Sequence, residues 1–138
     1  MPAGRRVYVD TNIIIYQVEG QPDLRQKLAN LFIKELDGAQ FLTSQITIAE
    51  CLLGAHKRGD AALVETYREI FGGSGVFQLI PVGLEILERA ALFGAQQRLK
   101  LIDAVHVASA LTTGCDTFLT NDAGIRCDDI RVIQLDGV

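Results

Sequence analysis

The chain has 138 residues, of which 49% are hydrophobic and 22% charged, and its formal net charge is −4. Length and composition are typical of one globular domain, expected here over residues 1–138, and they exclude a disordered or low-complexity chain. The negative charge argues against a protein that binds nucleic acid simply through a basic surface. It is compatible with an enzyme whose own site is acidic.

The sequence predicts a cytoplasmic protein with free cysteines. The segment MPAGRRVYVD lacks the apolar core of a signal peptide, and no apolar run approaches the ~18 residues of a membrane span. The cysteines are Cys51, Cys115 and Cys127, an odd number without a CxxC pair. This pattern indicates neither a disulfide framework nor a zinc site, so we expect buried free thiols.

The first predicted strand covers residues 5–9 and ends at Asp10 in the segment VYVDTNIIIY. A carboxylate inside a strand buried on both faces would lose its solvation at a high cost unless it were paired or bound to metal. Asp10 should therefore stand at the end of the strand. Either Thr11 or Asn12 could cap the helix that follows, because both side chains accept hydrogen bonds from free helical N–H groups.

Helix and strand patterns alternate along the rest of the chain. In chain order, we predict a helix at 23–37, a strand at 41–44, helices at 46–55 and 60–71, a strand at 76–82, helices at 84–97 and 101–113, and strands at 117–120 and 130–135. Gly38 and Gly114 are expected to end the first and last of these helices. The alternation predicts an α/β fold with a parallel sheet of about five strands and helices on both faces.

Four acidic residues stand out against their apolar surroundings, and parallel sheets of this kind bind ligands beyond the carboxyl ends of their strands. They are Asp10, Glu50, Asp103 and Asp122. Taken singly, each has an ordinary explanation. Asp10 and Asp122 could be turn residues, Glu50 an exposed helix residue, and Asp103 a first-turn acid favoured by the helix dipole.

Taken together, the four acids indicate a metal site. Crowded carboxylates repel one another and raise one another's pKa, so a fold that gathers them normally needs a divalent cation. Oxygen ligands suit Mg²⁺ or Mn²⁺. Such ions activate water and stabilise the charge that develops when a phosphodiester is attacked in line.

The motifs around these acids resemble those of PIN-domain ribonucleases, in particular the VapC-like toxins of type II toxin–antitoxin systems. The matching segments are VDTNIIIY, the TIAE of SQITIAECLLG, LIDAVHVASAL with the glycine that follows, and FLTND. They occur in the family's order and extend from near the start of the chain to Asp122. The resemblance implies a three-layer α/β/α PIN-like fold. It also implies Mg²⁺- or Mn²⁺-dependent endonuclease action on RNA, with 5′-phosphate and 3′-hydroxyl products.

The resemblance also assigns roles to residues. The family's catalytic, metal-binding acids fall on Asp10, Glu50, Asp103 and Asp122. Its supporting polar residues fall on Asn12 and Thr120. Asp116 is close to the last acid in sequence, but it precedes the strand at 117–120 and should lie at the opposite edge of the sheet. The family further implies a small antitoxin as partner and a homodimer.

Two other functions remain open from the sequence. A phosphatase with an aspartyl nucleophile also starts with an acid after the first strand, but such enzymes usually carry DxD, and here Asn12 occupies the third position. A non-catalytic binding module could use the same scaffold. None of these functions needs His106, which shares a helical stripe with Asp103 and Ser109. We expect His106 to be a polar residue of that stripe and not a metal ligand, because the expected ion prefers oxygen.

Overall fold

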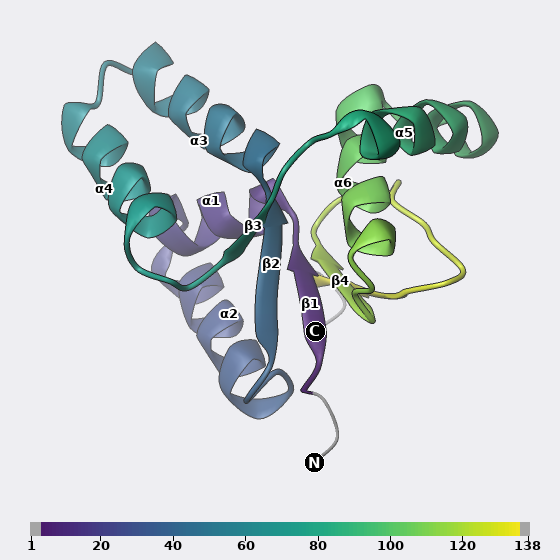
Figure 1. The fold of residues 1–138 in the computed structure, drawn as a ribbon. Helices are drawn as coiled ribbons and strands as arrows, with labels where there is room; N and C mark the ends of the chain where they lie inside the picture. Colours follow the sequence, from purple (N-terminus) through teal and green to yellow (C-terminus); the bar gives the residue numbers. More distant parts are fainter. Residues whose placement is uncertain (1–3, 136–138) are drawn as a thin grey trace.

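The structure, a computed structural model, describes residues 4–135, which contain a five-stranded parallel sheet with helices on both faces (Figure 1). In chain order the elements are β1 (Arg6–Val9), α1 (Thr11–Glu19), α2 (Pro22–Lys34), β2 (Gln40–Ser44), α3 (Gln45–Lys57), α4 (Ala61–Gly72), β3 (Gln78–Ile80), α5 (Leu84–Gln97), α6 (Leu101–Thr112), β4 (Thr117–Thr120) and β5 (Arg131–Gln134).

The strand order is β3-β2-β1-β4-β5, and every adjacent pair is parallel. Parallel neighbours require crossover connections, and helices supply most of them. Helices α1 to α4 pack into one core cluster and α5 and α6 into the other, on opposite sides of the strands in Figure 1. The predicted three-layer α/β/α fold with about five parallel strands is confirmed.

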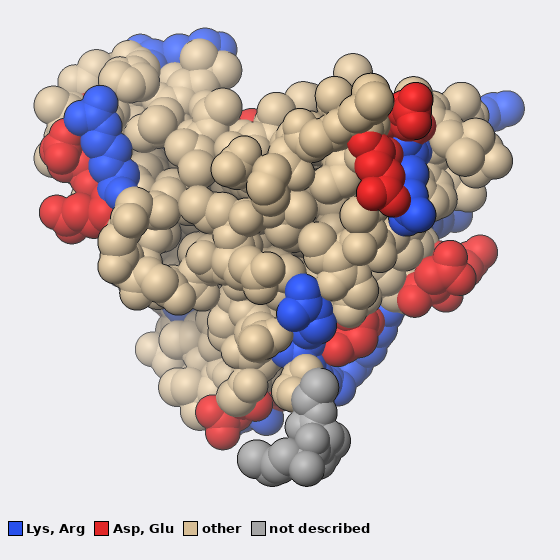
Figure 2. All heavy atoms as spheres, viewed as in Figure 1, with Lys and Arg blue, Asp and Glu red and all other residues tan. Residues whose placement is uncertain are grey.

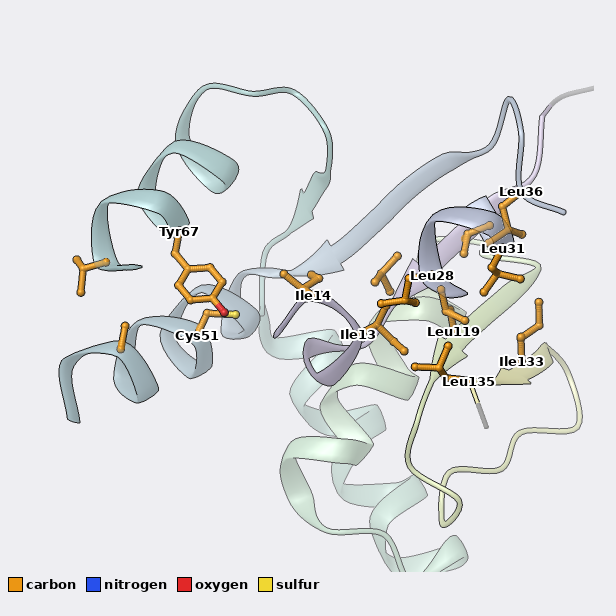
Figure 3. Packing of buried hydrophobic residues seen from close by; sticks show 14 residues of the cluster. Ile13, Ile14, Leu28, Leu31, Leu36, Cys51, Tyr67, Leu119, Ile133 and Leu135 are labelled. Carbon is orange, nitrogen blue, oxygen red and sulfur yellow. The ribbon is translucent and has the colours of Figure 1, made fainter. Parts of the chain in front are cut away.

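The central strand β1 is buried on both faces, which explains its uninterrupted apolar sequence. Val7 and Val9 belong to the cluster under α1 to α4, together with Ile13 of α1 (Figure 3). Tyr8 points to the other face, where its ring stacks on Phe118 of β4 with 5.0 Å between the ring centroids. Only its first residue, Arg6, is partly exposed, and the next charged residue, Asp10, appears after the strand has ended.

Helix α2 ends earlier than the sequence predicts. The pattern favoured a helix to residue 37 that Gly38 would stop, but α2 ends at Lys34, with Glu35 as its C-cap. The backbone N–H of Leu36 still reaches the Leu31 carbonyl at 3.3 Å, and the Leu36 side chain, 1% exposed, enters the core. Gly38 has φ +76° in the turn before β2. Burial of Leu36 therefore sets the end of α2, and Gly38 serves the turn.

The other helix boundaries agree with the predictions to within about two residues. Helix α6 ends just before Gly114, whose φ of +71° allows the chain to turn toward β4. Strand β3 is shorter than predicted. All three cysteines are free, and Cys51 and Cys115 are buried as expected, whereas Cys127 is only half-buried. Within residues 4–135, no helix is both long and apolar enough to cross a membrane.

Candidate active site

The four acids predicted from the sequence gather at the carboxyl edge of the sheet. Asp10 follows β1 directly and Asp122 follows β4 by two residues, while Glu50 lies on α3, which begins where β2 ends. Asp103 lies in the first turn of α6. Electrostatic repulsion acts on Asp103 from Asp122 and Asp10, and on Asp10 from Glu50. The fold therefore brings four carboxylates into one electrostatically coupled group.

Asp10 is the most deeply placed of the four, with 3% of its surface exposed. Its Oδ1 accepts a hydrogen bond from the Thr11 backbone N–H at 2.9 Å. Its Oδ2 accepts from the Thr120 hydroxyl at 2.7 Å and from the Asn12 amide at 3.3 Å. Burial raises the pKa of Asp10 above its usual value, although nearby His106 and the hydrogen bonds from Thr120 and Thr11 oppose the shift.

The prediction that Thr11 or Asn12 caps α1 is wrong, because Asp10 is the N-cap. The Asp10 backbone has the extended conformation of a cap, with φ −68° and ψ 153°, and its side chain accepts from Thr11 N. Thr11 already has helical geometry, and its hydroxyl is used elsewhere in the site. One carboxylate thus ends the strand, starts the helix and faces the other acids.

The two residues predicted to support the acids, Asn12 and Thr120, tie the ends of β1 and β4 together. The Asn12 carbonyl oxygen accepts from the Asn121 backbone N–H at 3.1 Å, and its amide lies 3.5 Å from Thr120 Oγ1. Thr120 is fully buried, and its oxygen also accepts from the Asp122 N–H at 3.0 Å. The same hydroxyl therefore contacts Asp10 and the backbone of Asp122.

Glu50 is held by two donors on one of its oxygens. Its Oε1 accepts from the Thr11 hydroxyl at 2.7 Å and lies 2.8 Å from Nε2 of His106. Partial burial alone would raise the pKa of Glu50, but the hydrogen bonds from His106 and Thr11 outweigh burial and leave that pKa below its usual value. About a third of the Glu50 side chain remains exposed. The carboxylate is therefore ionised and reaches the surface of the site.

His106 is the site residue that the sequence analysis missed. Its side chain is 1% exposed on α6, with Nε2 3.7 Å from Asp10 Oδ1 in addition to its contact with Glu50. Its other ring nitrogen, Nδ1, lies 2.6 Å from the Tyr8 hydroxyl. The sequence feature that could have identified His106 as part of the site is its position one helical turn after Asp103, on a helix that is otherwise almost entirely apolar.

The two remaining acids have far fewer partners. Asp103 is half-buried and makes no side-chain hydrogen bond within the described part of the chain, whereas Asp122 Oδ1 accepts from the Gly124 N–H at 2.9 Å. Burial, followed by repulsion from Asp122 and Asp10, raises the pKa of Asp103 above its usual value. Asp103 and Asp122 therefore retain most of their capacity to accept a ligand.

Asp116 lies at the other end of the strands, as the sequence predicts from strand direction. Its Oδ2 accepts from the backbone N–H of Arg6, at the start of β1, at 2.9 Å. Its Oδ1 accepts from the Thr117 hydroxyl at 2.7 Å. Asp116 therefore joins the amino ends of β1 and β4, while Asp122 follows their carboxyl ends.

The donor set of the four acids fits a hard divalent cation, although the acids are not closed around a single point. Among residues 4–135, no group of three or more His, Cys, Asp or Glu side chains lies close enough together to hold a metal ion as they stand. All four acids nevertheless offer carboxylate oxygens, the ligands that Mg²⁺ and Mn²⁺ prefer. Glu50 Oε2 and both Asp103 oxygens have no hydrogen-bond donor among the described residues. These oxygens are available to a cation.

Cationic side chains do not neutralise the four acids. Within the described part of the chain, no Lys or Arg forms an ion pair with any of them, and His106 is their only basic contact. On the face shown in Figure 2, the upper middle is uncharged, and charged side chains lie along the margins and in patches toward the right and the lower middle. The site therefore carries an excess of negative charge.

The comparisons with known proteins point to one family. The family model described as the PIN domain matches residues 7–127 of this chain. No curated protein matches it.

Solved structures share the fold at low sequence identity. VapBC2 from Rickettsia felis, bound to a promoter DNA fragment, matches with a TM-score of 0.71 and 17% identity over 94% of this chain and 98% of its own. A toxin–antitoxin complex from Klebsiella pneumoniae matches with a TM-score of 0.72 and 23% identity over 94% and 97%. VapC20 from Mycobacterium tuberculosis, described as a sarcin-ricin loop cleaving toxin, matches with a TM-score of 0.67 and 15% identity over 81% and 86%.

Proposed function

This chain belongs to the PIN domain family, and we propose that it is a divalent-metal-dependent endoribonuclease and the toxin of a type II toxin–antitoxin pair. The observation that supports the proposal most strongly is the group of four coupled carboxylates at the carboxyl edge of the sheet. Similarity to a toxin that cleaves the sarcin-ricin loop, and to toxin–antitoxin complexes, supports it further.

In this proposal Asp10, Glu50, Asp103 and Asp122 hold Mg²⁺ or Mn²⁺. The ion supplies the activation of water and the stabilisation of charge on the phosphoryl group. The protein's own contribution is positional. Thr120 and Asn12 hold Asp10 in place through hydrogen bonds to Oδ2. Thr11 and His106 hold Glu50, and the less restrained Asp103 and Asp122 complete the set from the other side.

The direct test is cleavage of mixed cellular RNA by the purified protein, with EDTA or with added Mg²⁺ or Mn²⁺. We expect cleavage only with the metal ion, and loss of cleavage in Asp122→Asn purified in the same way. That variant controls for a contaminating nuclease, which would act equally in both preparations. Equal wild-type cleavage with and without EDTA, absent from Asp122→Asn, would disprove the metal mechanism.

Two observations support an antitoxin partner: the structural similarity to toxin–antitoxin complexes and the unbalanced charge of the site. We propose that a small protein encoded by an adjacent gene presents an Arg or Lys to the acids, because Asp103 lacks a hydrogen-bond donor within the described residues. Co-expression and pull-down should recover a stable complex, and expression of the chain alone should arrest growth. Absence of both effects would contradict the toxin assignment.

We also propose a homodimer that acts in the cytoplasm, to be checked by light scattering and cell fractionation.

A phosphatase with Asp10 as nucleophile is disfavoured by the sequence that follows this residue, because Asn12 stands where such enzymes usually carry the second acid of DxD. Both Asp10 oxygens accept hydrogen bonds from within the protein, Oδ1 from Thr11 and Oδ2 from Thr120 and Asn12. Oδ1 accepts only one of these bonds and keeps a lone pair, so the contacts of Asp10 are compatible with either a metal ligand or a nucleophile. Trapping of a covalent aspartyl-phosphate would favour the phosphatase, and metal-dependent RNA cleavage without such an adduct would favour the nuclease.

A further inference from the structure

A buried polar chain stands behind Glu50, formed by residues far apart in the sequence. Tyr8 on β1 is fully buried and its hydroxyl lies 2.6 Å from Nδ1 of His106. His106 on α6 is 1% exposed, and its Nε2 lies 2.8 Å from Oε1 of Glu50 on α3. The chain therefore connects the central strand to the partly exposed carboxylate through a single imidazole ring.

The direction of the hydrogen bonds in this chain follows from what each group can donate. An ionised carboxylate only accepts, so Nε2 of His106 must carry a hydrogen and donate it to Glu50. In a neutral His106 ring, Nδ1 then accepts from the Tyr8 hydroxyl. In a charged ring, Nδ1 donates to the Tyr8 oxygen instead. The bond from Nε2 to Glu50 has the same direction in both cases.

The second donor to Glu50, the Thr11 hydroxyl, lies beside two buried threonines. The Thr43 hydroxyl donates to the Val9 carbonyl at 2.8 Å and lies 2.9 Å from Thr47 Oγ1. Thr47 Oγ1 in turn lies 3.0 Å from Thr11 Oγ1. Thr11 has a single hydroxyl hydrogen, and of its two oxygen contacts Glu50 Oε1 is the closer at 2.7 Å and the one that can only accept, so we assign that hydrogen to Glu50.

Both donors thus act on the same oxygen of Glu50. Oε1 accepts hydrogen bonds from the buried His106 and Thr11, while Oε2 has no hydrogen-bond donor within the described residues. From this geometry we infer that His106 is a positioning residue, which fixes the Glu50 carboxylate so that Oε2 is the oxygen presented to the metal ion. The inference rests on the proposed metal-dependent function, and the imidazole itself does not bind the ion.

The inference is tested by measuring the affinity of the 138-residue chain for Mn²⁺. The electron paramagnetic resonance signal of unbound Mn²⁺ reports how much of the ion the protein has taken up. His106→Leu removes the donor, and we expect about a tenfold or greater loss of affinity, the usual range for residues that orient a metal ligand. His106→Gln retains an N–H that can reach Glu50 and should recover part of the loss. Tyr8→Phe, which keeps the buried ring and removes only its hydroxyl, should weaken binding less than His106→Leu.

The same measurement in a Glu50→Gln protein separates a positioning role of His106 from a merely structural one. If His106 acts through Glu50, His106→Leu should cause no further loss of Mn²⁺ affinity in a Glu50→Gln protein, because the positioned group is already altered. An equal loss in both backgrounds, or no loss in either, would overturn the inference. Melting curves in EDTA identify any variant that fails to fold, and Tyr8→Phe is then compared in the two backgrounds in place of His106→Leu.

Nitrogen-15 NMR of the wild-type protein supplies a readout that needs neither metal nor mutation. We expect a hydrogen on Nε2 of His106, and its signal should shift in Glu50→Gln. A ring protonated only on Nδ1 would overturn the inference while leaving the nuclease proposal intact. If wild-type protein bound no Mn²⁺, the proposed metal function would fail, and with it the role assigned to His106, whatever the NMR result.

Discussion

The acidic site has two halves that the protein treats differently. The inner acids, Asp10 and Glu50, each accept at least two hydrogen bonds from the protein. The outer acids, Asp103 and Asp122, have a single side-chain acceptor contact between them within the described residues, from Gly124 to Asp122. The fold therefore directs its buried donors at one half of the site and gives the other half far fewer hydrogen bonds.

The pKa shifts reflect this difference. Hydrogen bonds from His106 and Thr11 overcome partial burial and lower the pKa of Glu50. Burial and repulsion raise the pKa of Asp103, which has no hydrogen-bond donor within residues 4–135 and is opposed only by the charges of His106 and Lys100. Asp10 is an inner acid whose pKa is nevertheless raised, because its deeper burial outweighs its hydrogen bonds. The inner half is thus positioned by the protein, and the outer half is the part that a cation would complete.

The largest expected effect concerns the outer half and RNA cleavage. Asp122→Asn should reduce the cleavage rate by at least about a hundredfold, since it removes a proposed ligand and not merely a group that orients one. Asp116→Asn is the matched control, because Asp116 is an acid that flanks the same strand but lies at the amino end of β4. Initial rates under identical Mg²⁺ should separate the two variants. An inactive Asp116→Asn beside an active Asp122→Asn would mean that the last ligand is wrongly assigned.

The next effect tests the donors of the inner half. Thr120→Val keeps the buried shape but removes the hydroxyl that contacts Asp10 at 2.7 Å. We expect it to lower the free energy of unfolding by about 2 kcal/mol, the scale for leaving a buried charged group short of a hydrogen bond. Urea denaturation in EDTA measures the loss. Thr120→Ser, which retains the hydroxyl, should lose clearly less, and equal losses would show that packing of the methyl group is what matters.

The stability effects of the two halves should have opposite signs without metal. Asp103→Asn removes one repelling charge and should be slightly more stable than wild type in EDTA, by less than about 1 kcal/mol, because the group is half-exposed and screened. Glu50→Gln should be less stable, because it exchanges a carboxylate held by two donors for a neutral amide. Added Mn²⁺ should raise the melting temperature of Asp103→Asn less than that of wild type. Destabilisation of Asp103→Asn in EDTA, with a wild-type response to Mn²⁺, would instead identify Asp103 as an ordinary first-turn acid favoured by the helix dipole.

The smallest effect is the pH dependence of these differences. A lowered folded-state pKa means that the contribution of Glu50 is present above its usual value of 4.5 and is lost as the pH falls through the folded value. The folded-state pKa of Asp103 is raised, so the ionised carboxylate lowers the stability of the fold at any pH above that raised pKa. This loss of stability disappears as the pH falls to 3.8, the usual pKa of an Asp side chain. Both variants should therefore approach wild-type stability in acid, from opposite sides. Differences from wild type that did not change between pH 7 and pH 3 would contradict the electrostatic account.

The sequence by itself determined the elements and the edge at which the acids meet. Apolar periodicity and turn residues are local signals, so the helices and strands could be placed to within a few residues, with α2 as the clearest exception. Because the carboxyl ends of parallel strands share one edge, strand direction alone separated Asp122 from Asp116. Asp10, Asn12 and Thr120 could likewise be grouped from their positions after strands, although their roles in binding metal remain predictions.

Only the tertiary structure decided which groups hold which acid. Tyr8 and His106 are 98 residues apart, and His106 and Glu50 are 56 apart, so no spacing in the sequence reports that their polar atoms meet in the core. The early end of α2 has the same origin, because burial of Leu36 in the core outweighs the local helical pattern. Local propensity and strand direction can be read along a chain. The hydrogen-bond partner of a buried polar group cannot, because each such group must be paired, and packing between distant segments determines which donor or acceptor lies within reach.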